Sequence, residues 1–169
     1  ALGRISAAIG TMHLKNGQPD SALIMLRYAI TASEKVGNVK YISTLMNEMG
    51  RVYIQKNRFD SASVYLYTAE GMAFETDHLS SLVETHKILT NYYIQQGRKD
   101  SSLFYAQMSL DEVMSVDREA NLGIVYENLF RAYALNKQLD SAYKYQGLAL
   151  TTKDSLFNEK IKVLSEYQN

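Results

Sequence analysis

The sequence predicts an all-helical array of about four helix hairpins with a period of 40 residues, followed by a C-terminal helix. The first observation is an Asp-Ser pair that recurs at 40-residue intervals: Asp20-Ser21, Asp60-Ser61, Asp100-Ser101 and Asp140-Ser141. The second is a pair of small residues in phase with each Asp: Ala22 and Ala29, Ala62 and Ala69, Ser102 and Ser109, Ala142 and Ala149. The third is a ring seven residues before each Asp: His13, Tyr53, Tyr93 and Tyr133. Small residues seven positions apart lie on one helix face, which lets a neighbouring helix approach closely. The ring, which lies on the preceding helix, can then pack over these small residues.

Each hairpin contains two helices separated by a short polar turn. From the N-terminus we expect helices near residues 3–15, 20–35, 39–56, 60–75, 78–96, 100–116, 118–136 and 140–152, and a ninth near 155–167. The Asp of each Asp-Ser pair is expected to cap the second helix of its hairpin, because its carboxylate can accept from unpaired N–H groups. Asn38, Asp77 and Asp117 are expected to cap the first helices of the later hairpins. Pro19, the only proline, falls in a turn, which favours long helices elsewhere.

The repeat divides the chain into an array at 1–153 and a C-terminal capping or connecting helix at 154–169. Within the array we place the repeats at about 3–37, 38–76, 77–116 and 117–153. A chain of 169 residues is long enough to bury one continuous core. We therefore expect one domain.

Composition and charge exclude several classes of partner. Lys plus Arg and Asp plus Glu both number 18, so the formal net charge is zero. A neutral chain lacks the basic excess that nucleic-acid or anionic-membrane binding requires, and we expect neither. There is no cysteine, so disulfides and thiolate metal sites are excluded. The longest apolar run, at 22–26, is too short to cross a membrane.

The sequence contains no recognisable catalytic or metal-binding constellation. The four Asp-Ser pairs repeat with the array, which favours structural positions over a single catalytic centre, and the Gly-x-Ser-x-Gly nucleophile motif is absent. His13, His78 and His86 have no partner at a metal-ligand spacing and are expected to be packed or surface imidazoles. We therefore expect no enzyme activity, no cofactor and no metal.

The residues of the second repeat resemble the tetratricopeptide repeat (TPR) family. Met49-Gly50 and Tyr53 match the first helix of that motif, and Ala62 and Ala69 match the second. The resemblance spans residues 3 to about 152 and implies a right-handed α-solenoid of TPR-like hairpins. The sequence departs from the family where the motif has Trp, which is replaced by Ser6, Met46, His86 and Tyr126. Its period of 40 also exceeds the usual value of about 34.

A narrower resemblance concerns the C-terminal part of the chain. The Asp-Ser-Ala pairs, followed by Lys153-Asp154-Ser155-Leu156 and the tail at 158–167, look like the repeat regions of bacterial sensor histidine kinases and membrane-tethered transcription regulators. This resemblance implies the sensing or interaction segment of a bacterial signalling protein. It favours the periplasmic or cell-envelope side, with the cytoplasm as the alternative.

The first helix of each repeat is expected to line a concave binding surface. If Tyr53, Tyr93 and Tyr133 are buried, the residues two and six positions earlier point away from the core. These candidate binding residues are Asn47, Arg51, Lys87, Asn91, Glu127 and Arg131. The family resemblance implies that such positions hold a protein or peptide, and Glu127 is expected to pair with Arg131 at i, i+4. The alternative interpretation is a set of solvated helix faces.

The predicted function is a non-catalytic scaffold that binds a protein or peptide. The alternative from another class is structural: a self-associating or spacer module, for which a weak homodimer is expected.

Overall fold

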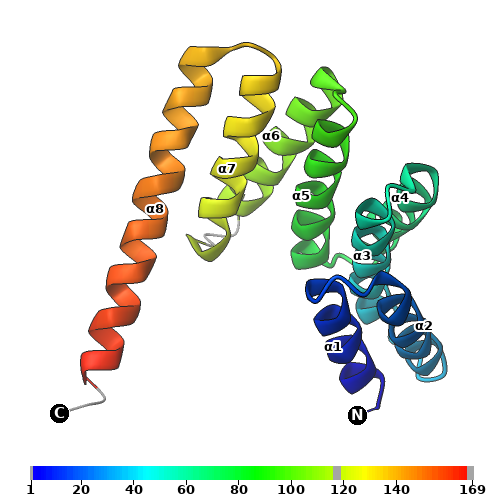
Figure 1. Cartoon of the computed structure of the whole chain (residues 1–169). Helices are drawn as coiled ribbons and strands as arrows, with labels where there is room; N and C mark the ends of the chain where they lie inside the picture. The colour runs from blue at the N-terminus through cyan, green and yellow to red at the C-terminus, as the bar shows by residue number, and fades with distance from the viewer. Residues whose placement is uncertain (1, 116–118, 167–169) are drawn as a thin grey trace. The chain divides into compact units, whose positions relative to one another are not determined.

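The computed structural model describes residues 2–115 and 119–166, which form eight α-helices and contain no strand (Figure 1). The helices are α1 (Leu2–Lys15), α2 (Pro19–Glu34), α3 (Val39–Gln55), α4 (Phe59–Glu75), α5 (Leu79–Gln95), α6 (Lys99–Ser115), α7 (Glu119–Leu135) and α8 (Leu139–Glu166). Successive helices pack as hairpins, as in an α-solenoid. The predicted all-helical hairpin array is therefore confirmed.

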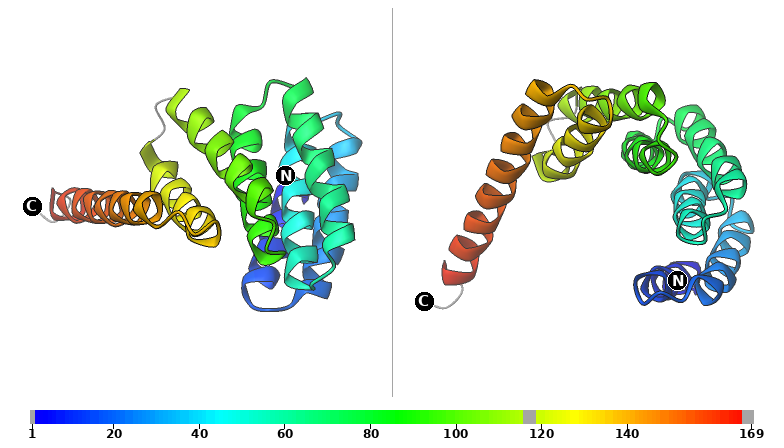
Figure 2. Two further views of the ribbon diagram at one scale, coloured as in Figure 1. Left: turned by 90° about the horizontal axis from the view of Figure 1, so that it is seen from above. Right: turned by 45° about the horizontal axis from the view of Figure 1, so that its top comes forward.

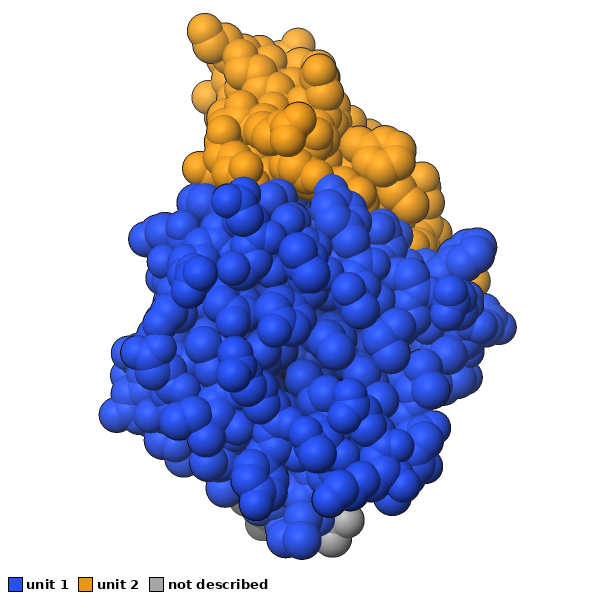
Figure 3. Space-filling model, turned by 90° about the vertical axis from the view of Figure 1, so that its right-hand side faces the viewer, with its two compact units in different colours: residues 1–92 blue, residues 93–169 orange. Residues whose placement is uncertain are grey.

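The chain divides into two compact units, residues 1–92 and 93–169, which Figure 3 colours separately. The first unit contains two hairpins, in which α1 lies beside α2 and α3 beside α4, together with most of α5 (Figure 2). The second contains the end of α5, helix α6 and the hairpin of α7 and α8, with α6 packed against α7.

Each hairpin turn contains one residue in the left-handed backbone region at the same repeat position. These residues are Gly17, Asn57, Gly97 and Lys137, with φ of 71°, 54°, 66° and 60°. Two reversed hydrogen bonds close the end of the preceding helix; in the second repeat Asn57 N donates to Ile54 O and Arg58 N to Tyr53 O, both at 2.9 Å. This pair of bonds is the Schellman arrangement, which satisfies carbonyls at the helix end. The left-handed residue therefore fixes where each first helix stops.

The predicted aspartate caps are wrong where the helix start is described. Helices α2 and α4 begin one residue before Asp20 and Asp60, and their cap residues, Gln18 and Arg58, make no side-chain cap bond. The aspartates lie in the first turn, where a carboxylate interacts favourably with the positive end of the helix dipole. The Asn38 cap is confirmed, because its Oδ1 accepts from Tyr41 N at 3.2 Å. Asp77 lies two residues before α5 with φ of 49°, and Asp117 lies outside the described residues.

The two helices of a hairpin approach closely at the small residues. A Cβ added to Gly50 would lie 2.5 Å from Leu66 Cδ2, and one added to Gly10 would lie 3.0 Å from Leu26 Cγ. Leu26 and Leu66 are fully buried. These two glycines therefore leave the space that a leucine of the second helix fills.

The three tyrosines among the predicted rings stack on further tyrosines, which were not predicted. The stacked pairs are Tyr53–Tyr65, Tyr93–Tyr105 and Tyr133–Tyr145, with ring centroids 5.2, 5.5 and 5.4 Å apart. Each pair joins a first helix to the second helix of its own hairpin.

The C-terminal part differs from the prediction. We expected a break near residue 154 and a ninth helix, but α8 runs without interruption from Leu139 to Glu166. No proline or glycine occurs between 148 and 166 to end the helix. The proposed domain at 154–169 is therefore a continuation of the last helix as far as Glu166. None of the described helices combines the length and the apolar character that crossing a bilayer requires.

Candidate binding surface

Helices α3 and α5 together present a cluster of four charged side chains. We call Glu48, Arg51, Glu84 and Lys87 the charged cluster. The Glu84 carboxylate accepts from both cations: Arg51 Nη2 donates to Oε1, and Lys87 Nζ donates to Oε2 at 2.6 Å. The cluster contains two of the predicted binding residues, Arg51 and Lys87. Glu48 and Glu84 were not predicted as site residues, although each lies three residues before one of these cations.

Arg51 retains hydrogen-bonding capacity within this cluster. Its Nε lies 3.5 Å from Glu48 Oε1, within ion-pair distance, but the geometry is not that of a hydrogen bond. Nε is buried, while the side chain as a whole is 40% exposed. A guanidinium carries five N–H donors in one plane. Arg51 can therefore contact an external acceptor without losing its bond to Glu84.

Lys87 does not face solvent as predicted. Its side chain is buried against Glu84, and burial lowers the pKa of the Lys87 ammonium, with the neighbouring Arg51 charge as a smaller cause. A buried lysine is costly unless it is paired, and the Glu84 carboxylate supplies the pair. Lys87 thus supports the orientation of Glu84 more than it offers a contact to a ligand.

Asn47 is also interior, contrary to the prediction that it points away from the core. Its Nδ2 donates to the Ser81 carbonyl at 3.2 Å, and its Oδ1 accepts from Thr85 Oγ1 at 2.9 Å. Ser43 Oγ donates to Ser81 Oγ at 2.9 Å beside it. All four side chains are buried. Asn47, six residues before Tyr53, therefore joins α3 to α5, and this explains why it is interior.

The remaining predicted residues are partly accessible. Asn91 lies half-buried on α5, and Arg131 lies half-buried on α7. Glu127, also on α7, accepts from Lys153 Nζ of α8 at 2.6 Å, an ion pair that the sequence did not predict. The two residues are 26 positions apart, so no local spacing rule points to them.

The histidines are engaged with neighbouring side chains or backbone. His86 is buried, and its Nε2 lies 2.9 Å from Glu70 Oε1. His78 Nδ1 lies 3.1 Å from the Lys40 carbonyl, and His13 Nδ1 lies 2.6 Å from Gln18 Oε1. Among the residues that the structure describes, no group of three or more His, Cys, Asp or Glu could hold a metal ion.

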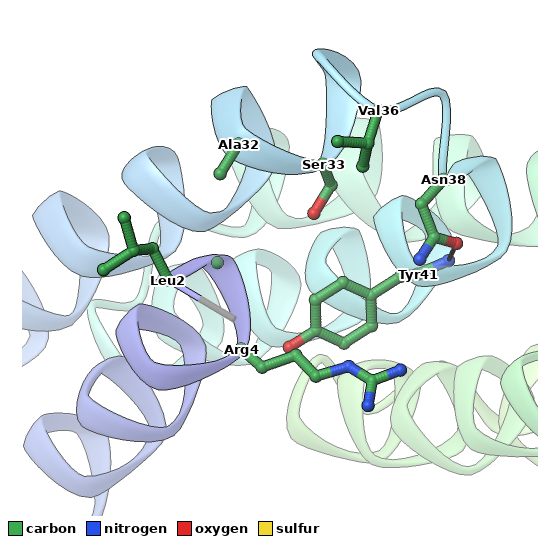
Figure 4. A pocket seen from close by; sticks show the side chains of 8 residues that line it. Leu2, Arg4, Ala32, Ser33, Val36, Asn38 and Tyr41 are labelled. Carbon is green, nitrogen blue, oxygen red and sulfur yellow. Dashed lines mark hydrogen bonds between the residues drawn. The ribbon is translucent and has the colours of Figure 1, made fainter.

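A recess lies where α1 begins, α2 ends and α3 begins (Figure 4). Its volume is about 390 Å³. The Arg4 guanidinium lies 6.0 Å from the centre of the Tyr41 ring, and Leu2 and Val36 supply apolar walls. Burial raises the pKa of the Tyr41 phenol, which stays neutral at physiological pH. The recess shares no residue with the charged cluster, and the one cation among its lining residues, Arg4, lies over the Tyr41 ring.

Comparison with known proteins bears on the fold. No protein-family model matches the sequence, and no curated protein matches it. The chain is similar to the crystal structure of BtubC (BKLC) from P. vanneervenii, with a TM-score of 0.78 and 16% sequence identity. The match covers 92% of this chain and 64% of BtubC, so the chain spans less than two thirds of that protein's length. At this level of identity the similarity establishes a shared helical fold.

Proposed function

We propose that the chain is a non-catalytic scaffold of the tetratricopeptide type, which binds a peptide or an extended segment of another protein across its first helices. The observation that carries the proposal is Arg51, whose side chain is 40% exposed although its guanidinium is already held in place by the bond to Glu84. A guanidinium has five N–H donors, so one that is held in place by a carboxylate can still donate to a ligand oxygen.

The chemistry of the charged cluster defines the ligand it favours. A peptide carbonyl or carboxylate can accept from the planar Arg51 donor fork, because arginine presents several N–H groups in a fixed geometry. Glu48 and Glu84, both partly accessible, can pair with a cationic group on the same ligand. Because the cluster carries equal numbers of acids and bases, we expect a ligand of mixed charge. A strongly anionic or cationic polymer would meet a like charge at this surface.

The wider role in a bacterial signalling protein of the cell envelope rests on the sequence resemblance at residues 153–167. The helical fold agrees with such a role.

The test is selection from a displayed library of random peptides, followed by titration of the enriched peptides. We expect peptides selected by the native chain to bind Arg51→Ala about ten- to a hundredfold more weakly, because hydrogen bonds to a charged group contribute about 1.5–3 kcal/mol. Arg27→Ala is the matched control, since Arg27 is exposed on α2, outside the charged cluster. It should leave the affinity unchanged.

Circular dichroism of each variant separates loss of binding from loss of helix. Equal affinity of Arg51→Ala and the native chain would remove the charged cluster from the binding surface. Failure of the native chain to enrich any peptide would contradict the peptide-binding proposal itself.

A further inference from the structure

Helix α4 carries an exposed stripe of four residues with little polar character. Val64, Tyr67 and Phe74 are 64%, 41% and 77% exposed, and Gly71 between them is exposed as well. Spacings of three, four and three residues place all four on one helix face, over about three turns. We call Val64, Tyr67, Gly71 and Phe74 the α4 stripe.

The next repeat does not cover this face of a second helix. Within the first unit, the second helices α2 and α4 lie on the outer side of the first helices α1 and α3 (Figure 2). The residues of α2 at the repeat positions of the α4 stripe are all exposed, although α3 and α4 belong to the same unit. These residues are Ile24, Arg27, Thr31 and Glu34. The stripe therefore occupies positions that face outward even where the following repeat is in place.

The α4 stripe is less polar than its counterparts in α2 and α6. In α2 three of the four equivalent positions carry a polar side chain. In α6 the two central positions are Gln107 and Asp111, and Gln107 Nε2 donates to Asp111 Oδ1 at 3.0 Å. At the same two positions α4 has Tyr67 and Gly71. Exposed apolar residues that gather on one face, and do not occur singly, indicate an interaction site.

Gly71 forms a notch in the middle of the stripe. No atom of the described residues lies within 4 Å of a Cβ added there, whereas the space beside Gly50 is filled by Leu66. Glycine inside a helix is destabilising relative to alanine, and nothing packed against Gly71 offsets this effect. A residue without a side chain lets a second helix approach closely. The notch therefore suits a helix that crosses α4 at Gly71.

The charges around the stripe favour a basic partner. Residues 59–75 contain Asp60, Glu70 and Glu75 but no lysine or arginine, although the whole chain is neutral. Asp60 lies about one turn before Val64, Glu75 directly follows Phe74, and both acids are exposed. A partner with basic residues beside its apolar face would meet an acid at each end of the stripe. A second α4 would instead bring acids against acids.

We propose that the α4 stripe binds an amphipathic helix of another protein, in which lysine or arginine flanks the apolar face. An amphipathic helix presents apolar residues three and four positions apart, which matches the spacing of the stripe. The acids of α4 repel the phosphates of nucleic acids and of anionic lipids, so these are not the partner. The site lies on the outer face of a second helix and is independent of the charged cluster on α3 and α5.

The test is selection from a displayed library of helical peptides about 20 residues long, with leucine or alanine on one face and all other positions randomised. We expect the native chain to enrich peptides with lysine or arginine beside the leucine face, with dissociation constants of about 1–100 µM. Phe74→Ala should bind these peptides about tenfold more weakly or worse, because aromatic side chains contribute strongly to binding. Phe74 is exposed, so its replacement leaves the core intact, and circular dichroism checks this.

Gly71→Ala provides a result that a purely structural role would not produce. It should bind the enriched peptides at least about fivefold more weakly, because the added methyl group prevents the close approach of the partner. Its urea midpoint should nevertheless rise, because alanine favours the helix. Ile24→Ala is the matched control, since Ile24 is 60% exposed at the same repeat position as Val64 but lies on α2. It should leave the affinity unchanged.

The proposal is overturned if the library yields no binding peptide, or if the enriched peptides show no excess of basic residues. It is also overturned if Phe74→Ala and Gly71→Ala bind them as the native chain does, or if Ile24→Ala weakens them equally. Sedimentation velocity tests the other occupant. Self-association of the native chain that is lost in Phe74→Ala would assign the stripe to a second copy and overturn the proposal.

Discussion

The same substitution, glycine to alanine, should have opposite effects on stability at two positions in neighbouring helices. At Gly50 the added Cβ would lie 2.5 Å from Leu66 Cδ2 and 2.7 Å from Leu66 Cγ, about 1 Å inside an ordinary carbon contact of about 3.5–4.0 Å. Leu66 is fully buried, so it has little room to move. At Gly71 in α4 no atom lies within 4 Å of the added Cβ.

The magnitudes follow from two competing terms. Overpacking a core costs about 1–3 kcal/mol, while alanine stabilises a helix interior by up to about 1 kcal/mol relative to glycine. We therefore expect Gly50→Ala to lower the free energy of unfolding by about 1–2 kcal/mol. Gly71→Ala should raise it by up to about 1 kcal/mol, because only the propensity changes there.

Urea unfolding followed by circular dichroism measures both effects. With a slope of about 2 kcal/mol per molar urea, the Gly50→Ala midpoint should fall by about 0.5–1 M. Adding Leu66→Ala, the residue type at position 106 of the next repeat, should abolish the penalty of the extra Cβ in a double-mutant cycle. A Gly50→Ala chain as stable as Gly71→Ala would refute the close approach of α3 and α4.

Three further outcomes are expected from urea unfolding. Lys137→Gly should raise the free energy of unfolding by about 1 kcal/mol, because a side chain at φ of 60° is strained; no gain relative to Lys137→Ala would contradict this. Burial raises the pKa of the Tyr133 phenol, so the unfolded chain loses this proton first and stability falls as pH rises above about 10. Between about pH 9 and about pH 11, the free energy of unfolding of Tyr133→Phe should fall less than that of the native chain. Parallel pH profiles of the two proteins would contradict the raised pKa of Tyr133. Asn47→Ala should cost about 1–3 kcal/mol, because it leaves buried partners at Ser81 and Thr85 unsatisfied, and an unchanged midpoint would contradict that role.

The helical hairpins were predictable because their signals are local and repeat. The same pattern of a ring, two small residues and a polar turn recurs every 40 residues. A repeat in which the pattern is weak can therefore be recognised from its spacing to the others. The predicted caps, Asp20 and Asp60, lie two residues after the observed cap residues, because an aspartate is favoured both at the cap and in the first turn of a helix. The extent of α8 was missed because the Asp-Ser pair at 154–155 resembles the Asp-Ser pairs of the repeats but is not preceded by a left-handed residue such as those in the four hairpin turns.

The candidate surface was predictable only in part. Arg51 was identified by its distance from Tyr53 along one helix. Asn47 and Lys87 were misjudged because that distance says nothing about which face meets the neighbouring helix. The bonds of Asn47 reach residues 34 to 38 positions away, and only the packing of α3 on α5 brings these groups together.

The close approach of Gly50 to Leu66 also determines which helices can recognise each other while the chain folds. Four similar first helices and four similar second helices could in principle pair in many ways. Joining α3 to α6 would set Gly50 opposite the smaller Ala106 and leave a void, whereas joining α5 to α4 would drive Thr90 into Leu66. Differences in side-chain volume at this repeated position thus disfavour exchange of helices between the second and third repeats, whereas the first two repeats share the same glycine and leucine.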